Sequence, residues 1–430
     1  MRRFEQDERF WEVRTDGPVV RTRFGTVGRR GDVREVEREL ATPALAAEAA
    51  ARAVARTVAA GFAEVDPAVH GGPSLAHTPL ELPLWEDPSD AAAWGAYAAW
   101  LRTQGPQHAD RAALAALEAD GDRSPRRDAL LRQVRERDLT ALCEAYDWRP
   151  PDRGPEIGQA PRLGYAFGFW STLEGAVVPA LDADAARFLT AVRVRAPDDD
   201  GYGPEPAYAD ALAKLRAAPL PGLRRFELDD TAYQLSWIDL GCFDLFVPCP
   251  RLEHVRLVAG DLTLGEVRAP RLVSFTVRTT GLKVQVVEAL CAGELPALEV
   301  LDLWIGDPGR SDVGVADLAL LHRPWPRLRH LGLGNAPLTD ALVDVLADSP
   351  VLPQLVSLDL AGGTLTRVGA ERLVARADRF RHLSLDLEGN LLDEEAAAAV
   401  ARALPDVGCD DQREVEDDDD DPSYYVSVGE

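Results

Sequence analysis

Apolar residues recur along the second half of the chain as Leu-x-x-Leu-x-Leu, with other apolar residues replacing some of the leucines. Clear copies begin at Leu223, Leu298, Leu328 and Leu355. Counted from Phe226, the fourth positions of successive copies lie 29, 20, 26, 30, 27 and 27 residues apart. Self-similarity with a period of roughly 20–50 residues indicates a protein built from stacked units.

The spacers between the later copies have the period of helices. Segments 339–347, 366–377 and 393–404 each place apolar residues on one face of a helix, and each starts with a residue suited to cap a helix. The spacers around 195–265 are less regular, and we expect them to lack full helices. One strand and one helix cannot bury their own apolar face, so neighbouring units stack and share a core. The pattern therefore predicts an α/β solenoid over residues 151–408, with a parallel sheet inside and helices outside.

The repeats resemble the ribonuclease-inhibitor-like class of leucine-rich repeats. That resemblance implies a concave sheet surface that binds a protein partner, as in a non-catalytic adaptor or scaffold. The sequence contains no His-Glu-x-x-His, Gly-x-Ser-x-Gly or Walker-type lysine loop, so we expect no enzymatic activity and no cofactor.

The concave positions follow from the alternation of side chains along a strand, which directs the third, fifth and seventh residues of each copy to the same face. These residues are rich in arginine in the early copies and in acidic residues in the late ones, with a tryptophan between, and Trp and Arg are enriched at binding hot spots. The alternative is that the charges are solvated and paired across neighbouring strands. The predicted protein-binding residues are Arg193, Arg195, Arg225, Glu227, His254, Arg256, Arg278, Asp302, Trp304, His330, Asp359, Asp386 and Glu388.

The start of the chain has the alternation of half-buried strands. Residues 9–14 and 19–24 each alternate apolar and polar side chains, and Asp16-Gly17 between them favours a hairpin turn. We expect a third strand over 33–40 and an Ala-rich helix over 43–62. Together these elements predict a small α+β domain over residues 1–66.

This first domain resembles a WGR domain, through Phe10-Trp11-Glu12-Val13, Phe24-Gly25-Thr26 and the Ala-rich helix that follows. In poly(ADP-ribose) polymerases such domains help bind DNA ends, so DNA-end or nucleic-acid sensing is the alternative function. The name-giving Trp-Gly-Arg triplet lacks its arginine here, the residue that would pair with phosphate. The nucleic-acid-binding residues that the resemblance implies are Trp11, Arg21, Arg23, Phe24, Gly25, Arg29 and Arg30.

Two further segments precede the repeats, and one follows them. Residues 67–89 are rich in Pro and Gly and predict a linker. Residues 90–150 predict helices over 90–101, 109–118 and 126–145, and resemble the helical companion domain that precedes bacterial leucine-rich repeats. Residues 409–430 form an acidic tail, in which 424–428 are expected to form a strand that caps the solenoid; an exposed peptide motif is the alternative.

The net charge and the cysteine content argue against particular kinds of binding site. The net charge of −25 argues against broad binding to nucleic acid, which needs Lys and Arg to displace counterions. Five cysteines at irregular spacing predict neither a disulfide framework nor a metal site. Because no signal peptide or long apolar segment is apparent, we expect a cytoplasmic protein with no membrane partner. We also expect a monomer.

Overall fold

The computed structural model shows two compact units, Met1–Arg149 and Pro150–Glu430. The described residues are 2–6, 9–16, 18–26, 29–59, 62–65, 78–146, 162–175, 181, 184–194, 205–217, 220–228, 238–413, 416–418 and 421–423.

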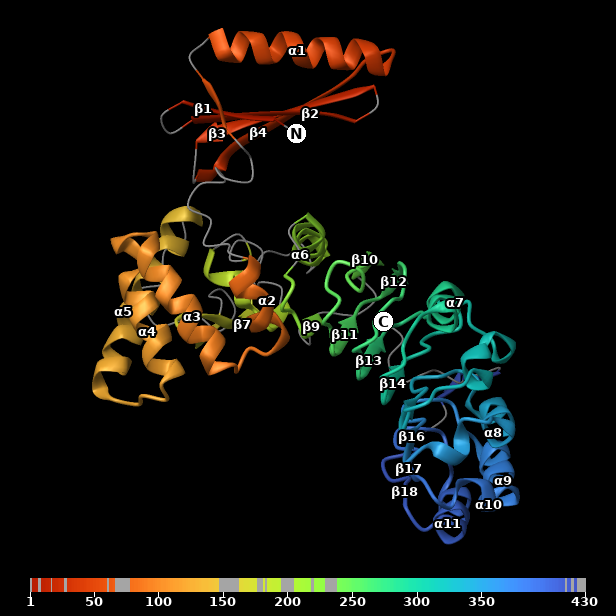
Figure 1. The fold of residues 1–430 in the computed structure, drawn as a ribbon. Coiled ribbons are helices and arrows are strands. Elements are labelled where there is room, and N and C mark those ends of the chain that lie inside the picture. The colour runs from red at the N-terminus through yellow and green to blue at the C-terminus, as the bar shows by residue number, and fades with distance from the viewer. Residues whose placement is uncertain are drawn as a thin grey trace. The chain divides into compact units, whose positions relative to one another are not determined.

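The first unit begins with an antiparallel sheet in the order β4-β3-β2-β1-β5, with one helix across one face (Figure 1). Phe4, Val13 and Val20 from the sheet and Ala46 and Val54 from the helix form the shared core. The elements are β1 (Arg2–Gln6), β2 (Arg9–Asp16), β3 (Val19–Thr26), β4 (Arg29–Glu39), α1 (Pro43–Ala59) and β5 (Ala63–Val65).

The hairpin predicted around Asp16-Gly17 is confirmed by the pairing of β2 with β3. The third strand starts earlier than expected, and α1 ends at Ala59 rather than Phe62. Strands β1 and β5 were not predicted. Each strand is short, and β1 carries a single buried apolar residue, Phe4, so neither shows an alternation of apolar and polar residues. The two strands form because β1 pairs with β2 and β5 pairs with β1.

The rest of the first unit is helical: α2 (Thr78–Glu86), α3 (Ala91–Leu101), α4 (Ala109–Ala119) and α5 (Pro125–Tyr146). The prediction of a linker over 67–89 is wrong for α2, which contains Pro83 and forms because Leu84 is buried and Glu81 accepts a hydrogen bond from Tyr97. A buried ion pair between Arg111 and Asp138 (2.6 Å) joins α4 to α5.

The second unit is an α/β solenoid built on one 11-stranded sheet, in the order β18-β17-β16-β15-β14-β13-β11-β9-β8-β7-β6. An antiparallel hairpin, β6–β7, starts the sheet, and every later neighbour pair is parallel. The predicted solenoid is thus confirmed, and the hairpin was not foreseen. The strands are β6 (Arg162–Ala166), β7 (Phe169–Gly175), β8 (Ala191–Val194), β9 (Arg225–Leu228), β11 (His254–Val258), β13 (Ser274–Arg278), β14 (Val300–Leu303), β15 (His330–Gly332), β16 (Ser357–Asp359), β17 (Ser384–Asp386) and β18 (Val407–Gly408).

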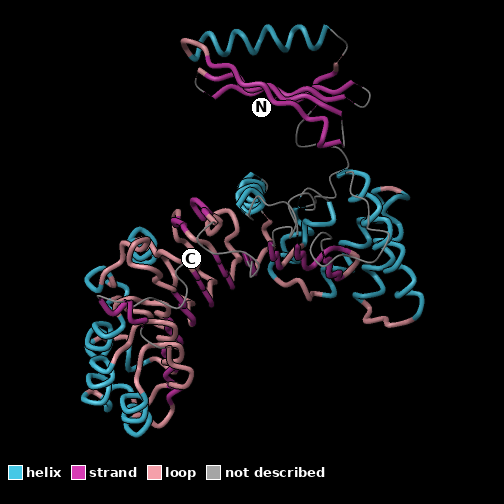
Figure 2. Tube along the Cα trace, turned by 180° about the vertical axis from the view of Figure 1, so that it is seen from behind, coloured by secondary structure: helices cyan, strands magenta, loops and turns pink. Residues whose placement is uncertain are grey.

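An outer layer covers one face of this sheet (Figures 1 and 2). The helices predicted in the later spacers are present, although the second is interrupted at Arg376. The irregular region contains one full helix, α6, contrary to expectation, and then a two-stranded sheet of β10 and β12 in place of helices. The outer elements are α6 (Glu205–Ala217), β10 (Asp239–Phe243), β12 (Asp261–Leu264), α7 (Val284–Ala292), α8 (Thr339–Asp348), α9 (Arg367–Ala375), α10 (Ala377–Phe380) and α11 (Glu394–Ala403).

The C-terminal end of the solenoid is capped by polar contacts just after β18. Gln412 donates to the carbonyl of Leu387, and Arg413 donates to those of Gly389 and Gly363. The strand predicted over 424–428 lies outside the described residues. Part of the acidic run instead forms a short hairpin, β19 (Glu416–Asp418) with β20 (Asp421–Ser423).

Candidate functional site

The face of the solenoid sheet opposite the outer layer carries a column of residues in register from strand to strand. Arg193 on β8 pairs with Glu227 on β9, which pairs with Arg256 on β11. The column continues through Thr276, Asp302, Gly332, Asp359 and Asp386. Residues on either side of these positions in each strand are buried, as the period of a strand requires.

The structure describes most of the predicted concave residues and places them on this face. Arg225, His254 and His330 form a second column beside the first. Arg278 is the last residue of β13, and Trp304 and Glu388 come just after β14 and β17. Arg195 lies outside the described residues. The face therefore has two parts, named here by their residues: the basic patch is Arg193, Arg225, Arg256 and Arg278, and the acidic strip is Asp302, Asp359, Asp386 and Glu388.

Within the basic patch, one carboxylate serves more than one arginine. Glu227 lies 3.6 Å from Arg193 Nε and 3.3 Å from Arg225 Nη1. Partial burial and the charge of Arg225 lower the pKa of His254. The expected pairing of charges across strands therefore occurs, but Glu227 is shared between arginines rather than matched to one.

Where the two parts meet, Arg278 stacks on Trp304, with its guanidinium carbon 4.7 Å from the ring centroid. The same arginine approaches Asp302, with 3.9 Å between Nε and Oδ2. Stacking fixes the plane of the guanidinium, and the N–H groups at its edge can still donate hydrogen bonds to a partner. These three side chains form the junction of the concave face.

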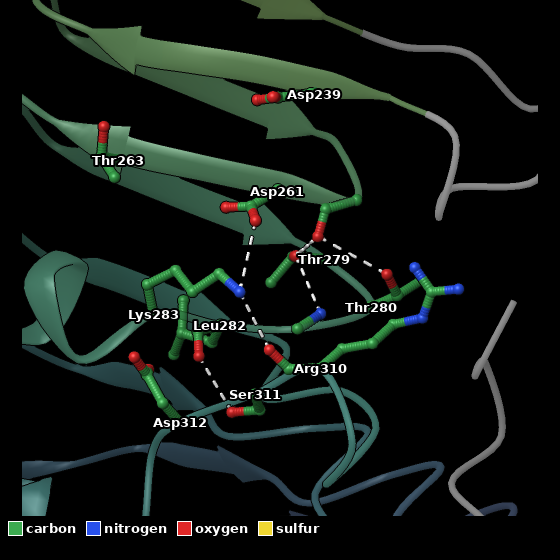
Figure 3. Close-up of polar contacts among 12 residues, drawn as sticks. Asp239, Asp261, Thr263, Thr279, Thr280, Leu282, Lys283, Arg310, Ser311 and Asp312 are labelled. Carbon is green, nitrogen blue, oxygen red and sulfur yellow. Dashed lines mark hydrogen bonds and ion pairs between the residues drawn. The ribbon is translucent and has the colours of Figure 1, made fainter.

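Buried threonines hold the backbone that follows Arg278 (Figure 3). Thr279 donates its hydroxyl hydrogen to the carbonyl of Gly260 (2.7 Å) and accepts from the amide of Gly281 (3.1 Å). Lys283 then links the repeats before and after it. Its ammonium group forms an ion pair with Asp261 (3.2 Å) and donates a hydrogen bond to the carbonyl of Arg310 (2.9 Å). These residues were not predicted, because nothing in the repeat pattern distinguishes them from other loop residues.

A gap in side chains separates Asp302 from Asp359. Gly332 occupies the column position between them, and a Cβ there would lie 2.5 Å from Asp302 Oδ1. At Gly334, a Cβ would lie 3.4 Å from the indole of Trp304. Gly332 and Gly334 were not predicted as part of the site. The available signal was Gly332, which stands at the fifth position of a repeat, where other copies place a concave side chain.

Burial raises the pKa of both Asp302 and Asp359 above the ordinary value of 3.8. Arg278 opposes the increase at each carboxyl, whereas the charge of Asp359 adds to it at Asp302 and that of Asp386 adds to it at Asp359. Neighbouring carboxylates of the acidic strip therefore repel one another, and this repulsion adds to the effect of burial in opposing their ionisation.

Asp359→Asn is expected to raise the free energy of unfolding by about 0.5–1 kcal/mol at neutral pH, the cost of like charges on neighbouring strands. A carboxyl whose folded pKa is raised binds more protons folded than unfolded, so stability falls as pH rises from 3.8 through the raised value. The gain should thus disappear in acid. Urea unfolding at several pH values measures it, with exposed Asp406→Asn as the control; an equal gain at all pH values would contradict the prediction.

The residues implied by the WGR resemblance are arranged differently. Trp11 packs against the core beside Phe4, with ring centroids 5.7 Å apart. Arg21 pairs with Glu37 at 2.7 Å, and Arg23 lies 3.9 Å from Glu12. Phe24 is partly exposed. The side chains of Arg29 and Arg30, and the surroundings of Gly25, lie outside what the structure describes. The two described arginines, Arg21 and Arg23, therefore each face a carboxylate.

In the described part of the chain, no three His, Cys, Asp or Glu side chains gather to hold a metal ion. Nor does any described helix have the length and apolar character needed to cross a membrane.

Comparison with known proteins identifies similarity to leucine-rich repeats. No family model matches the chain. Over 113 residues it is 35% identical to leucine-rich repeat-containing protein 43 of Mus musculus, covering 26% of this chain but only 16% of that protein. A structural-genomics protein from Bacteroides fragilis aligns over 100% of this chain and 99% of its own, with 18% identity and a TM-score of 0.49. The partial similarity and the repeated parallel strands support a leucine-rich-repeat-like fold for the second unit.

Proposed function

We propose that this protein is a non-catalytic adaptor or scaffold that binds a protein partner on the concave face of its solenoid. The observation that carries the proposal is the mostly charged column that runs in register across the sheet, with Asp302 in the column and its junction partners Arg278 and Trp304 beside it. Such a surface offers area, charge pattern and a central aromatic–arginine pair, which are the features that protein interfaces use. The similarity to a leucine-rich-repeat protein also supports it.

A charge reversal of the basic patch tests the proposal. The triple variant Arg225→Glu, Arg256→Glu and Arg278→Glu is expected to reduce recovery of bound proteins by about tenfold or more, because buried-interface charge changes cost several kcal/mol. Quantitative mass spectrometry of proteins captured by the full chain measures the loss. The matched control reverses Arg327, Arg381 and Arg402, which lie outside the sheet and change the net charge equally.

A photo-crosslinking residue gives a second measurement that does not depend on charge. Placed at position 304, it should capture the same partner that the reversal loses. Placed at Val368, which is 51% exposed on α9 in the outer layer, it should not. Equal crosslinking from both positions, or a partner list unchanged by the concave variant, would remove the concave face as the binding surface.

A further inference from the structure

The basic patch carries more positive charge than its described surroundings neutralise. On the concave positions of β8, β9, β11 and β13, four arginines stand against one glutamate, Glu227. Glu227 lies near Arg193 and Arg225. On the flanking strands, Glu174 is in register with Arg193 and Asp302 lies 3.9 Å from Arg278. Three described carboxylates thus face four arginines, and one positive charge is left for a ligand.

Arg256 is the centre of that excess. Among the described residues, it has neither a hydrogen bond nor an ion pair, although it is partly buried. Its neighbour in register is Glu227, but the two form neither a hydrogen bond nor an ion pair, and the carboxylate attracts the guanidinium only at longer range. Burial, and then the charge of Arg278, lower the pKa of Arg256. A guanidinium in this position gains most from an anion that brings its own negative charge.

We propose, building on the proposed function, that the basic patch binds an acidic segment of the protein partner, with side-chain carboxylates pairing to Arg256 and Arg278. A planar guanidinium pairs with a carboxylate through two parallel N–H···O bonds. Arg278 suits this role because Trp304 already holds its plane. The segment lies over β9, β11 and β13, which span about 10 Å at the usual strand spacing.

The acidic strip on the same face sets the limits of that segment. From β14 to β17, the third, fifth and seventh positions contain no lysine or arginine. A nucleic-acid backbone carries evenly spaced charge and would meet repulsion along this strip, as it would from the net charge of −25. A protein segment can confine its acidic residues to the part that crosses the patch. An acidic peptide therefore fits the whole surface better than a nucleic acid does.

The test uses the full chain and a fluorescein-labelled peptide of alternating Glu and Ser, about 12 residues long, which spans up to ~40 Å. Fluorescence anisotropy should show tighter binding than for the matched Gln-Ser peptide, and the affinity should fall with added salt as surface charges are screened over ~8 Å. Arg256→Glu with Arg278→Glu should weaken binding by about tenfold or more. Arg327→Glu with Arg402→Glu should leave it unchanged.

Neutralising the acidic strip separates its effect on peptide binding from that of the basic patch. Asp359→Asn with Asp386→Asn should keep or tighten peptide binding, since it removes only repulsion. Peptide binding no tighter than that of the Gln-Ser control, insensitivity to the arginine reversals, or tighter binding of a single-stranded oligonucleotide of equal charge would each overturn the inference. Crosslinking from position 304 is independent of these results, so the concave face could still bind a partner of other chemistry.

Discussion

Phe246→Ala is expected to lower the free energy of unfolding by about 3–5 kcal/mol, the usual cost of truncating a buried phenylalanine. Phe246 is fully buried and packs edge-on against Phe243 and Phe275, with centroids 5.1 and 5.8 Å away. Phe226 extends the row. These rings fill the core in the region where β10 and β12 replace helices, so the loss would loosen the strands that carry the basic patch.

Urea unfolding of the full chain, followed by circular dichroism, measures this loss. The adjacent Val247→Ala is the control, because its side chain is 51% exposed and its loss should change stability by no more than about 0.5 kcal/mol. Comparable effects of the two substitutions would show that the aromatic row does not stabilise this region.

Gly306→Ala is expected to cost about 3 kcal/mol or more, because two penalties add at this position. The residue has φ of +84°, which L side chains rarely adopt, and its Cβ would overlap the carbonyl of Thr280 in the neighbouring unit. The bridge between Gly281 and Gly306 brings the two backbones together. A shift of Thr280 would also disturb the loop that follows Arg278.

Gly241→Ala separates the two penalties. Gly241 has φ of +64°, but a Cβ there would meet nothing within 4 Å, so only the conformational cost of about 1 kcal/mol remains. Thermal unfolding of both variants measures the difference. If Gly306→Ala cost no more than Gly241→Ala, the close approach to Thr280 would not limit the packing of these units.

Gly306 illustrates why sequence alone left part of the packing near Arg278 hidden. It is a single glycine in a loop, and nothing nearby in sequence distinguishes it, because its neighbour Thr280 belongs to the preceding repeat. Gly332 is different, because its place at a fifth position of the repeat follows from the pattern. What the pattern omitted was its consequence, the gap between Asp302 and Asp359.

Helix α2 shows the same limit in the first unit. Pro79 and Pro83 indicate irregular structure when only local preference is considered. The helix forms because burial of Leu84 and Glu81 against other parts of the unit outweighs that preference. Local sequence does not contain this contribution, since it depends on what packs against the segment.

The sequence by itself determined the solenoid, its strand positions and the side of the sheet on which each charged residue lies. Those follow from a period of two within strands and from a repeat too short to bury its own core. The tertiary structure decided how the charges combine: that Glu227 is shared by two arginines, that Arg278 stacks on Trp304, and that Arg256 has no partner among the described residues. Apart from the Arg225–Glu227 contact within β9, these contacts join different repeats, and their distances depend on how the strands stack rather than on the order of residues along the chain.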